Sequence, residues 1–258
     1  MGRMRNKLVF EESMQLCRED ASLREGIIFS SYHQECIPYS ADIVVPESRG
    51  YDTEVTVVND RSMNAAISLP GRVCVHNFAS FTHPGGGVAN GSSAQEESLC
   101  RISTLYPCIS SERMMSLFYD PHRRFASGTY NSDIIYTPDI IVFRRDDSDM
   151  GLIPPEARYK VDVISCAAPN LNIVQPSPNE QYALMYERIG RIMDVAATNG
   201  ADSLVLGAFG CGVFMNDPSV VAKASKDALR DHPGSFLKVV FAIYGNDRNL
   251  EAFGDVFH

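Results

Sequence analysis

Apolar positions along the chain fall into short compact runs and longer segments of helical spacing, and the two kinds alternate. The segment from about Glu180 to Thr198 carries apolar residues at helical spacing and is closed by Gly200, which predicts a helix. Asp217 before Pro218 predicts a second helix, which we expect to reach about Arg230. The compact runs GRVCVHNF, YKVDVISCAAP, SLVLGAF and FLKVVFAIY predict strands. Strands that alternate with helices indicate an α/β fold with a largely parallel sheet.

The pattern is less regular in the first half of the chain. Residues 10–25 predict a helix, and residues 26–60 hold the apolar pieces IIF, DIVV and TEVTVV, which are typical of strands broken by turns. AQEESLCRISTLYPCI predicts a helix that Pro107 ends or kinks, and SERMMSLFY a second one. SDIIY and TPDIIVF predict a hairpin of two strands, and NLEAFGDVF a short closing helix.

The composition is typical of a globular protein, with more acidic than basic residues. The 258 residues include 45% hydrophobic and 21% charged residues, and no repeat or linker divides them, so one domain is the simplest account. The net charge is −9, which argues against direct binding of duplex nucleic acid through a broad basic face. Backbone N–H groups can still hold an anionic ligand in a local pocket.

The cysteines and the N-terminus bear on location. There are seven cysteines, an odd number, and none is spaced Cys-x-x-Cys, which favours a reduced, cytoplasmic protein over a disulfide scaffold or a zinc site. The start, MGRMRNKLVFEES, has no long apolar region of the secretory kind, and no run is long enough to span a membrane, so we expect no membrane partner.

The first chemistry-bearing loop is HPGGGVANGSSAQEES, between a predicted strand and a predicted helix. Three successive glycines, Gly85 to Gly87, let the backbone approach a ligand at the carboxyl end of a strand. Gln95, Glu96 and Glu97 then open the helix. The alternatives are a flexible surface turn for the glycines and plain first-turn acids for the glutamates.

The second loop is GAFGCGVFMNDP, which contains Gly207, Gly210 and Gly212. Its G-x-x-G-x-G order fails the dinucleotide fingerprint, and the chain has no G-x-x-x-x-G-K-[ST] loop for a nucleoside triphosphate. A strand, a glycine-rich turn and a helix N-terminus nevertheless favour phosphate, with a tight structural turn as the alternative. Cys211 has no visible base partner, so a small side chain in a tight turn explains it better than a nucleophile does.

Together the two loops resemble the bacterial-type poly(ADP-ribose) glycohydrolases. The residues that carry the resemblance are Gly-Gly-Gly, seven residues and then Gln-Glu-Glu, with HNFAS before and CRISTLYPCI after them, and also AAPN and GAFGCGVFMNDP. It spans roughly residues 72 to 246. It implies a macrodomain-like three-layer α/β/α fold with a mixed, largely parallel central sheet. The domain would be single, with residues 1–50 as an accessory N-terminal extension and residues 51–258 as the core.

The resemblance also implies roles for individual residues. Glu97 would protonate the leaving oxygen of the ribose–ribose bond, Glu96 would bind the ribose hydroxyls, and Gln95 would support both. The expected substrate-binding residues are Asn77 and Phe214 at the distal ribose, Gly85, Gly86, Gly87 and Val88 on one side of the diphosphate, Gly210, Cys211, Gly212 and Val213 on the other, and Tyr244 on the adenine side.

These residues predict hydrolysis of poly(ADP-ribose) carried by modified proteins, with release of ADP-ribose. Adjacent glutamates on a helix point about 100° apart, so one acting and one sugar-holding carboxyl is the better division. No metal or organic cofactor is implied, because acid–base chemistry suffices. His76, in an apolar strand, is expected to be structural. Two alternatives stay open: removal of single ADP-ribose units from protein, nucleic acid or metabolite, and a non-catalytic ADP-ribose reader.

Overall fold

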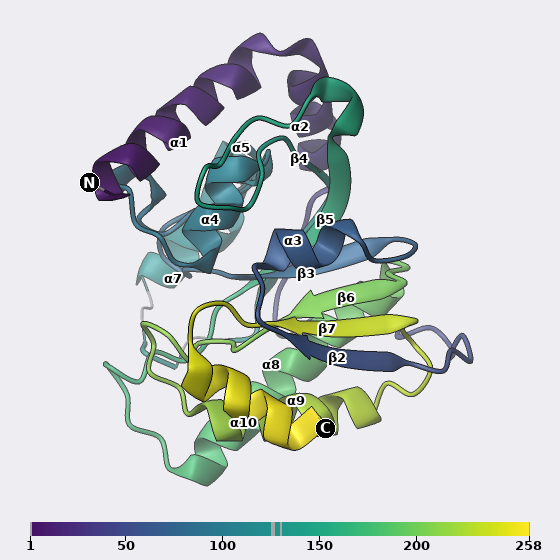
Figure 1. The fold of residues 1–258 in the computed structure, drawn as a ribbon. Coiled ribbons are helices and arrows are strands. Elements are labelled where there is room, and N and C mark those ends of the chain that lie inside the picture. Colours follow the sequence, from purple (N-terminus) through teal and green to yellow (C-terminus); the bar gives the residue numbers. More distant parts are fainter. Residues whose placement is uncertain (1, 125–126, 130, 258) are drawn as a thin grey trace.

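A seven-stranded sheet forms the centre of the computed structural model, which describes residues 2–124, 127–129 and 131–257 (Figure 1). The strand order is β1-β4-β5-β3-β6-β7-β2, and β4 alone runs against its neighbours. The bounds are β1 Glu35–Ile37, β2 Glu54–Val58, β3 Val73–Phe78, β4 Ile134–Val142, β5 Tyr159–Cys166, β6 Ser203–Leu206 and β7 Lys238–Ala242. The predicted mixed, largely parallel sheet is therefore confirmed.

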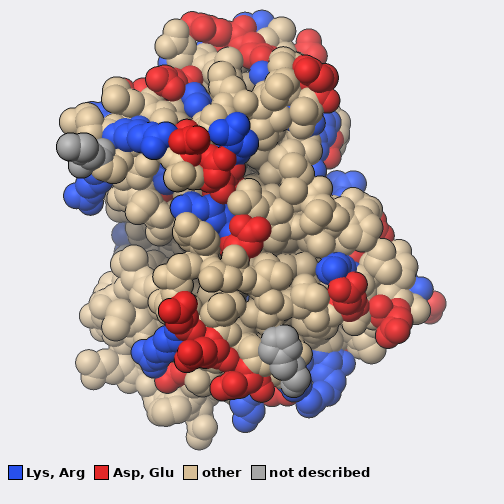
Figure 2. Space-filling model, viewed as in Figure 1, with Lys and Arg blue, Asp and Glu red and all other residues tan. Residues whose placement is uncertain are grey.

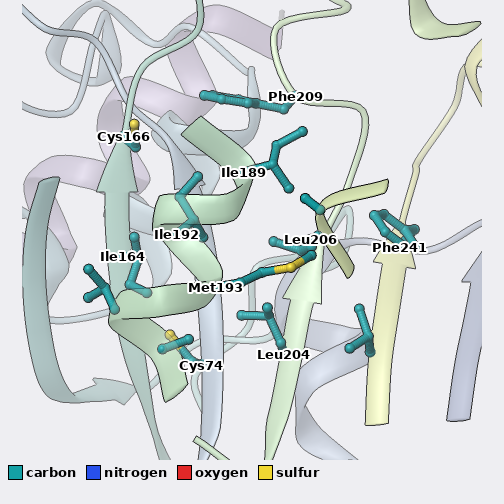
Figure 3. Close-up of a cluster of buried hydrophobic side chains, with 14 of the residues drawn as sticks. Cys74, Ile164, Cys166, Ile189, Ile192, Met193, Leu204, Leu206, Phe209 and Phe241 are labelled. Atoms are coloured by element: carbon teal, nitrogen blue, oxygen red, sulfur yellow. The ribbon is translucent and has the colours of Figure 1, made fainter. Parts of the chain in front are cut away.

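Helices cover both faces of the sheet and complete three layers. One face packs on α8 (Pro178–Thr198), α9 (Pro218–Arg230) and α10 (Asp247–Phe257). Figure 3 shows Ile189, Ile192 and Met193 of α8 against side chains of the strands. The other face packs on α1 (Gly2–Glu19), α3 (Ser62–Ile67), α4 (Gln95–Ile102) and α5 (Leu105–Ile109). The alternation of β3 explains the division, because Cys74 faces the first cluster while Val73 and Val75 face the second.

The helices and strands of the second half confirm the sequence prediction closely. Ser177 caps α8 in a capping box with Glu180, and the side chain of Asp217 accepts the N–H of Ser219 at the start of α9. The short closing helix is α10, and the predicted strands around β3, β5, β6 and β7 are present. A 3-10 turn, η3 (Pro155–Ala157), precedes β5.

The N-terminal prediction is wrong in two respects. Residues 10–25 belong to two helices, α1 and α2 (Ala21–His33), because Asp20 caps a new helix by accepting the N–H groups of Ser22 and Leu23 at 2.9 and 3.1 Å. IIF lies inside α2, whose buried Leu23 and Ser30 recur at helical spacing. DIVV forms no strand, whereas TEVTVV contains β2.

Two further elements differ from expectation. SDIIY and TPDIIVF form the single strand β4, in which the register shifts between Thr137 and Ile140. Pro138 has no N–H to donate to the ladder, so the strand bulges there instead of turning back.

The helix after the first loop breaks at Ser103, not at Pro107. Ser103 is extended and its hydroxyl accepts the N–H of Leu105, so Pro107 falls in the first turn of α5, where proline is tolerated. SERMMSLFY is helical as predicted, with α6 (Glu112–Met114) running into the π-turn η2 (Met115–Tyr119) and then α7 (Asp120–Arg124). Among the described residues, no helix combines the length and apolar character that a membrane crossing requires.

Candidate active site

A cavity of about 570 Å³ opens where β3, β6 and β7 end at their carboxyl ends. Parallel strands direct their following loops to this edge, which is the usual ligand site of an open α/β sheet. The expected site residues that line it are Gly86, Gln95, Glu96, Glu97, Gly210, Gly212, Val213, Phe214 and Tyr244. The cavity thus joins both glycine-rich loops to the end of the last strand.

The first loop folds back over the first turn of α4 and binds its carboxylates. Glu96 accepts the N–H of Ser80 at 2.8 Å and the N–H of Gly85 at 3.2 Å. Glu97 accepts the N–H of Gly87 through Oε1 at 2.9 Å. The loop therefore fixes the rotamers of two adjacent acids through separate backbone donors.

Gly86 lies between the two carboxylates with a positive φ of 55°. A Cβ at this position would lie 2.7 Å from Oε1 of Glu97 and 3.1 Å from Oε2 of Glu96. Any side chain would therefore displace one of the acids, which explains physically why glycine stands here.

The two glutamates differ in what their second oxygen meets. Burial raises the pKa of Glu96 to about 8, the N–H of Ser80 opposes this shift, and the charge of Glu97 adds to it. Both oxygens of Glu96 already accept backbone N–H groups. Oε2 of Glu97 is buried and has no hydrogen-bond partner in the described part of the chain. Glu97 is the acid with an oxygen available for chemistry.

Gln95 ties the helix to the end of β3. Its Oε1 accepts the N–H of Phe78 at 2.9 Å, and its Nε2 donates to the carbonyl of His76 at 2.7 Å and to Ser62 at 3.1 Å. Asn77 is buried behind the cavity, donates to Ser165 at 3.0 Å, and lies beside Glu96. Its Oδ1 has no partner among the described residues.

The second loop is held open by Asn216. This buried amide donates to the carbonyls of Pro169 at 2.8 Å and Gly210 at 3.1 Å. Gly210 has a φ of 72°, so the chain reverses there, and Gly212 and Val213 are exposed at the cavity. Within residues 127–129 and 131–257, the N–H groups of Gly212 and Val213 meet no backbone or side-chain acceptor. Such N–H groups can bind an anion.

Some expected site residues lie behind the cavity surface. Gly85, Gly87 and Val88 pack inside the first loop, and their N–H groups donate to Glu96, to Glu97 and to the carbonyl of Gly85, respectively. Cys211 is half-buried, and burial raises the pKa of its thiol to about 12, which disfavours a nucleophilic thiolate. The role of these residues toward a diphosphate stays a prediction.

The far end of the cavity holds residues that the sequence analysis did not identify. The guanidinium of Arg61 lies 4.3 Å from the ring centre of Tyr244, and its Nη1 lies 3.6 Å from buried Asp146. Asp60, Ser80 and Asn249 also line this cavity. Asp60 and Arg61 closely follow β2, Ser80 lies between β3 and the three glycines, and Asn249 lies in the first turn of α10. None of these four residues belongs to a glycine motif.

His76 has the structural role expected of it. Its ring is fully buried against Phe78 and Phe209, and burial lowers its pKa to about 3, so it is neutral. Among residues 2–124, 127–129 and 131–257, no group of three His, Cys, Asp or Glu side chains is arranged to hold a metal ion.

Comparison with known proteins gives a consistent likeness. The family model for the catalytic domain of microbial-type PARG matches residues 12–145. Poly(ADP-ribose) glycohydrolase (PARG) from Thermomonospora curvata is 28% identical with a TM-score of 0.88, over 99% of this chain and 100% of that chain. The same enzyme with the inhibitor ADP-HPD is 26% identical with a TM-score of 0.84, over 98% and 99%. PARG from Deinococcus radiodurans in complex with ADP-ribose is 31% identical with a TM-score of 0.77, over 90% and 96%. No curated protein matches the chain.

Proposed function

The chain belongs to the family of microbial-type poly(ADP-ribose) glycohydrolases, and we propose that Glu97 is the general acid with which it cleaves the ribose–ribose bond. The protein is a glycosidase that hydrolyses poly(ADP-ribose). One observation carries the assignment to Glu97: its Oε1 is held by the N–H of Gly87, while its buried Oε2 has no hydrogen-bond partner among the described residues. A fixed carboxyl with one oxygen left for substrate is suited to proton transfer.

The reaction follows from this geometry. Glu97 donates its proton to the leaving ribose oxygen as the glycosidic bond breaks, and the cleaved sugar passes through an oxocarbenium-like state. The ionised Glu97 then takes a proton from the water that attacks the anomeric carbon, which restores the acid. The nearby diphosphate of the substrate stabilises the transient positive charge.

Glu96 has a different role in this scheme. Both of its oxygens accept backbone N–H groups, and burial favours its protonated form at neutral pH. A carboxyl held in this way is suited to hydrogen bonds with ribose hydroxyls. Gln95 joins α4 to β3, which supports the pair, and Asn77 lies beside Glu96.

The diphosphate is assigned to the space between the two loops. The N–H groups of Gly212 and Val213, with Gly210 at the reversal, provide donors from the second loop. Gly85 to Val88 and Cys211 complete the loops around it, and Phe214 packs beside the distal ribose. Tyr244 provides the aromatic surface on the adenine side.

The remaining assignments concern context. The substrate is polymer attached to modified proteins, and the acidic net charge of −9 disfavours duplex nucleic acid as a direct partner. All seven cysteines are free, in keeping with a cytoplasmic location. Residues 1–50 act as an accessory extension to a core of residues 51–258 within one domain.

Release of ADP-ribose from automodified poly(ADP-ribose) polymerase tests the role of Glu97. We expect Glu97→Gln to lose about 10²- to 10⁴-fold in kcat, because proton donation is lost while the side-chain volume is kept. ADP-ribose binding, measured by calorimetry, should be retained. The matched control is Glu112→Gln, an exposed first-turn acid of α6 outside the cavity, which should keep full activity. A Glu97→Gln enzyme as active as the wild type would contradict the assignment.

A further inference from the structure

Arg101, in the last turn of α4, is a buried cation without an ion-pair partner. It is 2% exposed, and within the described ranges no carboxylate lies at ion-pair distance from it. A buried charge normally needs such a partner. Arg144 and Arg158, also largely buried, pair with Glu12 at 3.1 Å and with Asp20 at 2.8 Å. Arg101 therefore differs from these two arginines, and its burial calls for a specific reason.

The hydrogen bonds of Arg101 lead back to the catalytic acid. Its Nη1 donates to the carbonyl of Ser92, and its Nη2 to Ser98 Oγ at 3.3 Å. The N–H of Ser92 donates to the carbonyl of Gly87 at 3.2 Å, and the N–H of Gly87 donates to Glu97 at 2.9 Å. Glu97 precedes Arg101 by four residues, which puts both on one face of α4. The path closes a ring from Arg101 through the loop to Glu97 and back along the helix.

The positive charge of Arg101 interacts with the carboxylate of Glu97. Burial lowers the pKa of the guanidinium, and Glu97 is the carboxylate that opposes this most. A cation fixed one helical turn away favours the ionised form of a carboxylate. Arg101 can thus stabilise the charge that Glu97 carries after it has given up its proton.

We infer that Arg101 is a positioning residue for the reaction: it fixes the first loop against α4, so that Gly87 holds Glu97 in place, and it balances the charge of the spent acid. This inference rests on the proposed role of Glu97. Arg101 is absent from the cavity lining and acts only through Glu97 and the loop. It should therefore influence kcat far more than ADP-ribose binding.

The test compares kcat for polymer hydrolysis and the ADP-ribose Kd of Arg101→Met and Arg101→Lys with those of the wild type. We expect Arg101→Met to lose about 100-fold in kcat, as a misplaced catalytic group does, with the ADP-ribose Kd within about threefold of wild type. Arg101→Lys keeps the charge but not the planar guanidinium that donates to both Ser92 and Ser98, so it should lose about tenfold in kcat.

Arg158→Met is the matched control, since it removes another largely buried guanidinium, one that binds Asp20 and Ser22. It should leave kcat unchanged. An Arg101→Met kcat within threefold of wild type, or a loss of ADP-ribose affinity as large as the loss in kcat, would overturn the inference. If Arg101→Met does not fold, Arg101→Lys decides, and wild-type kcat in that variant overturns it. Wild type and Glu97→Gln are assayed alongside: an inactive wild type or an active Glu97→Gln counts against the proposed function, separately from Arg101.

Discussion

Glu96 and Glu97 are neighbours on one helix turn, yet backbone donors give them different environments. Glu96 receives two N–H groups, from Ser80 and Gly85, whereas Glu97 receives one, and its second oxygen meets no donor in the part of the chain that the structure describes. In the proposed mechanism, two chemically identical side chains therefore take different roles: Glu96, whose protonated form burial favours at neutral pH, binds the sugar, and Glu97 transfers the proton. The difference lies in the fold of the preceding loop, since the residue types are the same.

Glu96 should make stability depend on pH. Burial raises its pKa from 4.5 to about 8, so between these values the folded state binds more protons than the unfolded chain, and stability falls as pH rises. Glu96→Gln removes this titration. It also replaces one of the two oxygens that accept backbone N–H groups, but the free energy lost in this way does not depend on pH. Relative to wild type, the variant should gain on the order of a few kcal/mol in free energy of unfolding between pH 5 and pH 9. Urea unfolding at both pH values measures this, and a difference that stays constant with pH would refute it.

Single residues could be predicted from the sequence only where spacing carries the chemistry. The three glycines and the Gln-Glu-Glu run pointed to residues that line the cavity. Arg61 and Asp146 were missed because they reach the site from segments far from the two loops in the sequence. Ser80 was missed because it contributes through its backbone N–H, which no residue pattern marks. Arg101 was not identified either, because its role depends on its burial and on its bond to Ser92.

At the scale of elements, the first loop and α4 form one tightly packed unit. The loop donates three N–H groups to the two acids, and in return α4 donates through Arg101 to the loop carbonyl of Ser92. The N-cap position of α4, Ala94, has no side-chain cap. The carboxylates of the first turn therefore bind the preceding loop, which is a role that first-turn acids in an ordinary helix do not have.

Gly86→Ala tests how closely this unit is packed. The new methyl group would lie 2.7 Å from Glu97 Oε1, at a backbone position with φ 55°. We expect kcat to fall about 100-fold through displacement of the acid, and stability to fall by about 1–2 kcal/mol from strain. Kinetics with thermal unfolding measure both effects.

Gly190→Ala is the control for this substitution. Gly190 lies inside α8 with open space around it, so alanine should keep activity and raise stability by about 0.5–1 kcal/mol. Full activity in Gly86→Ala would show that the acids tolerate movement and that the close contact has no catalytic meaning.

Elements could be predicted where local chemistry marks their ends. The capping box of α8 and the Asp-Pro start of α9 are local, and both helices match the sequence prediction. The strand predicted for IIF is wrong because a short apolar run fits strand and helix alike. SDIIY and TPDIIVF are extended as predicted, but they do not pair with each other. Strands on both sides of β4 keep the chain extended through a bulge.

At the scale of the whole molecule, the N-terminal helices support the site from behind. Asn6 donates to the carbonyl of Gly91 at 3.1 Å, and a Cβ on Gly91 would lie 2.0 Å from the carbonyl oxygen of Arg3. The end of the first loop is thus packed against α1, which also contacts α4 (Figure 1). No local pattern in residues 2–19 predicts this contact, because it joins segments about 85 positions apart in the sequence.

The overall charge should show in how salt affects the reaction. The chain carries −9, and Figure 2 shows acidic and basic side chains interspersed on the face in view, with no continuous basic surface for a polyanionic substrate. At low ionic strength, repulsion between the acidic protein and the polyanionic substrate slows their encounter. Added salt screens this repulsion, because the Debye length shrinks to about 10 Å at 0.1 M salt. We expect kcat/KM for long polymer to rise about two- to fivefold between 20 and 150 mM NaCl, with kcat unchanged. An enzyme that binds polymer phosphates through lysines and arginines would lose affinity steeply over this range. A tenfold fall in kcat/KM would therefore show that local cations, and not neutral backbone N–H groups, dominate capture of the chain.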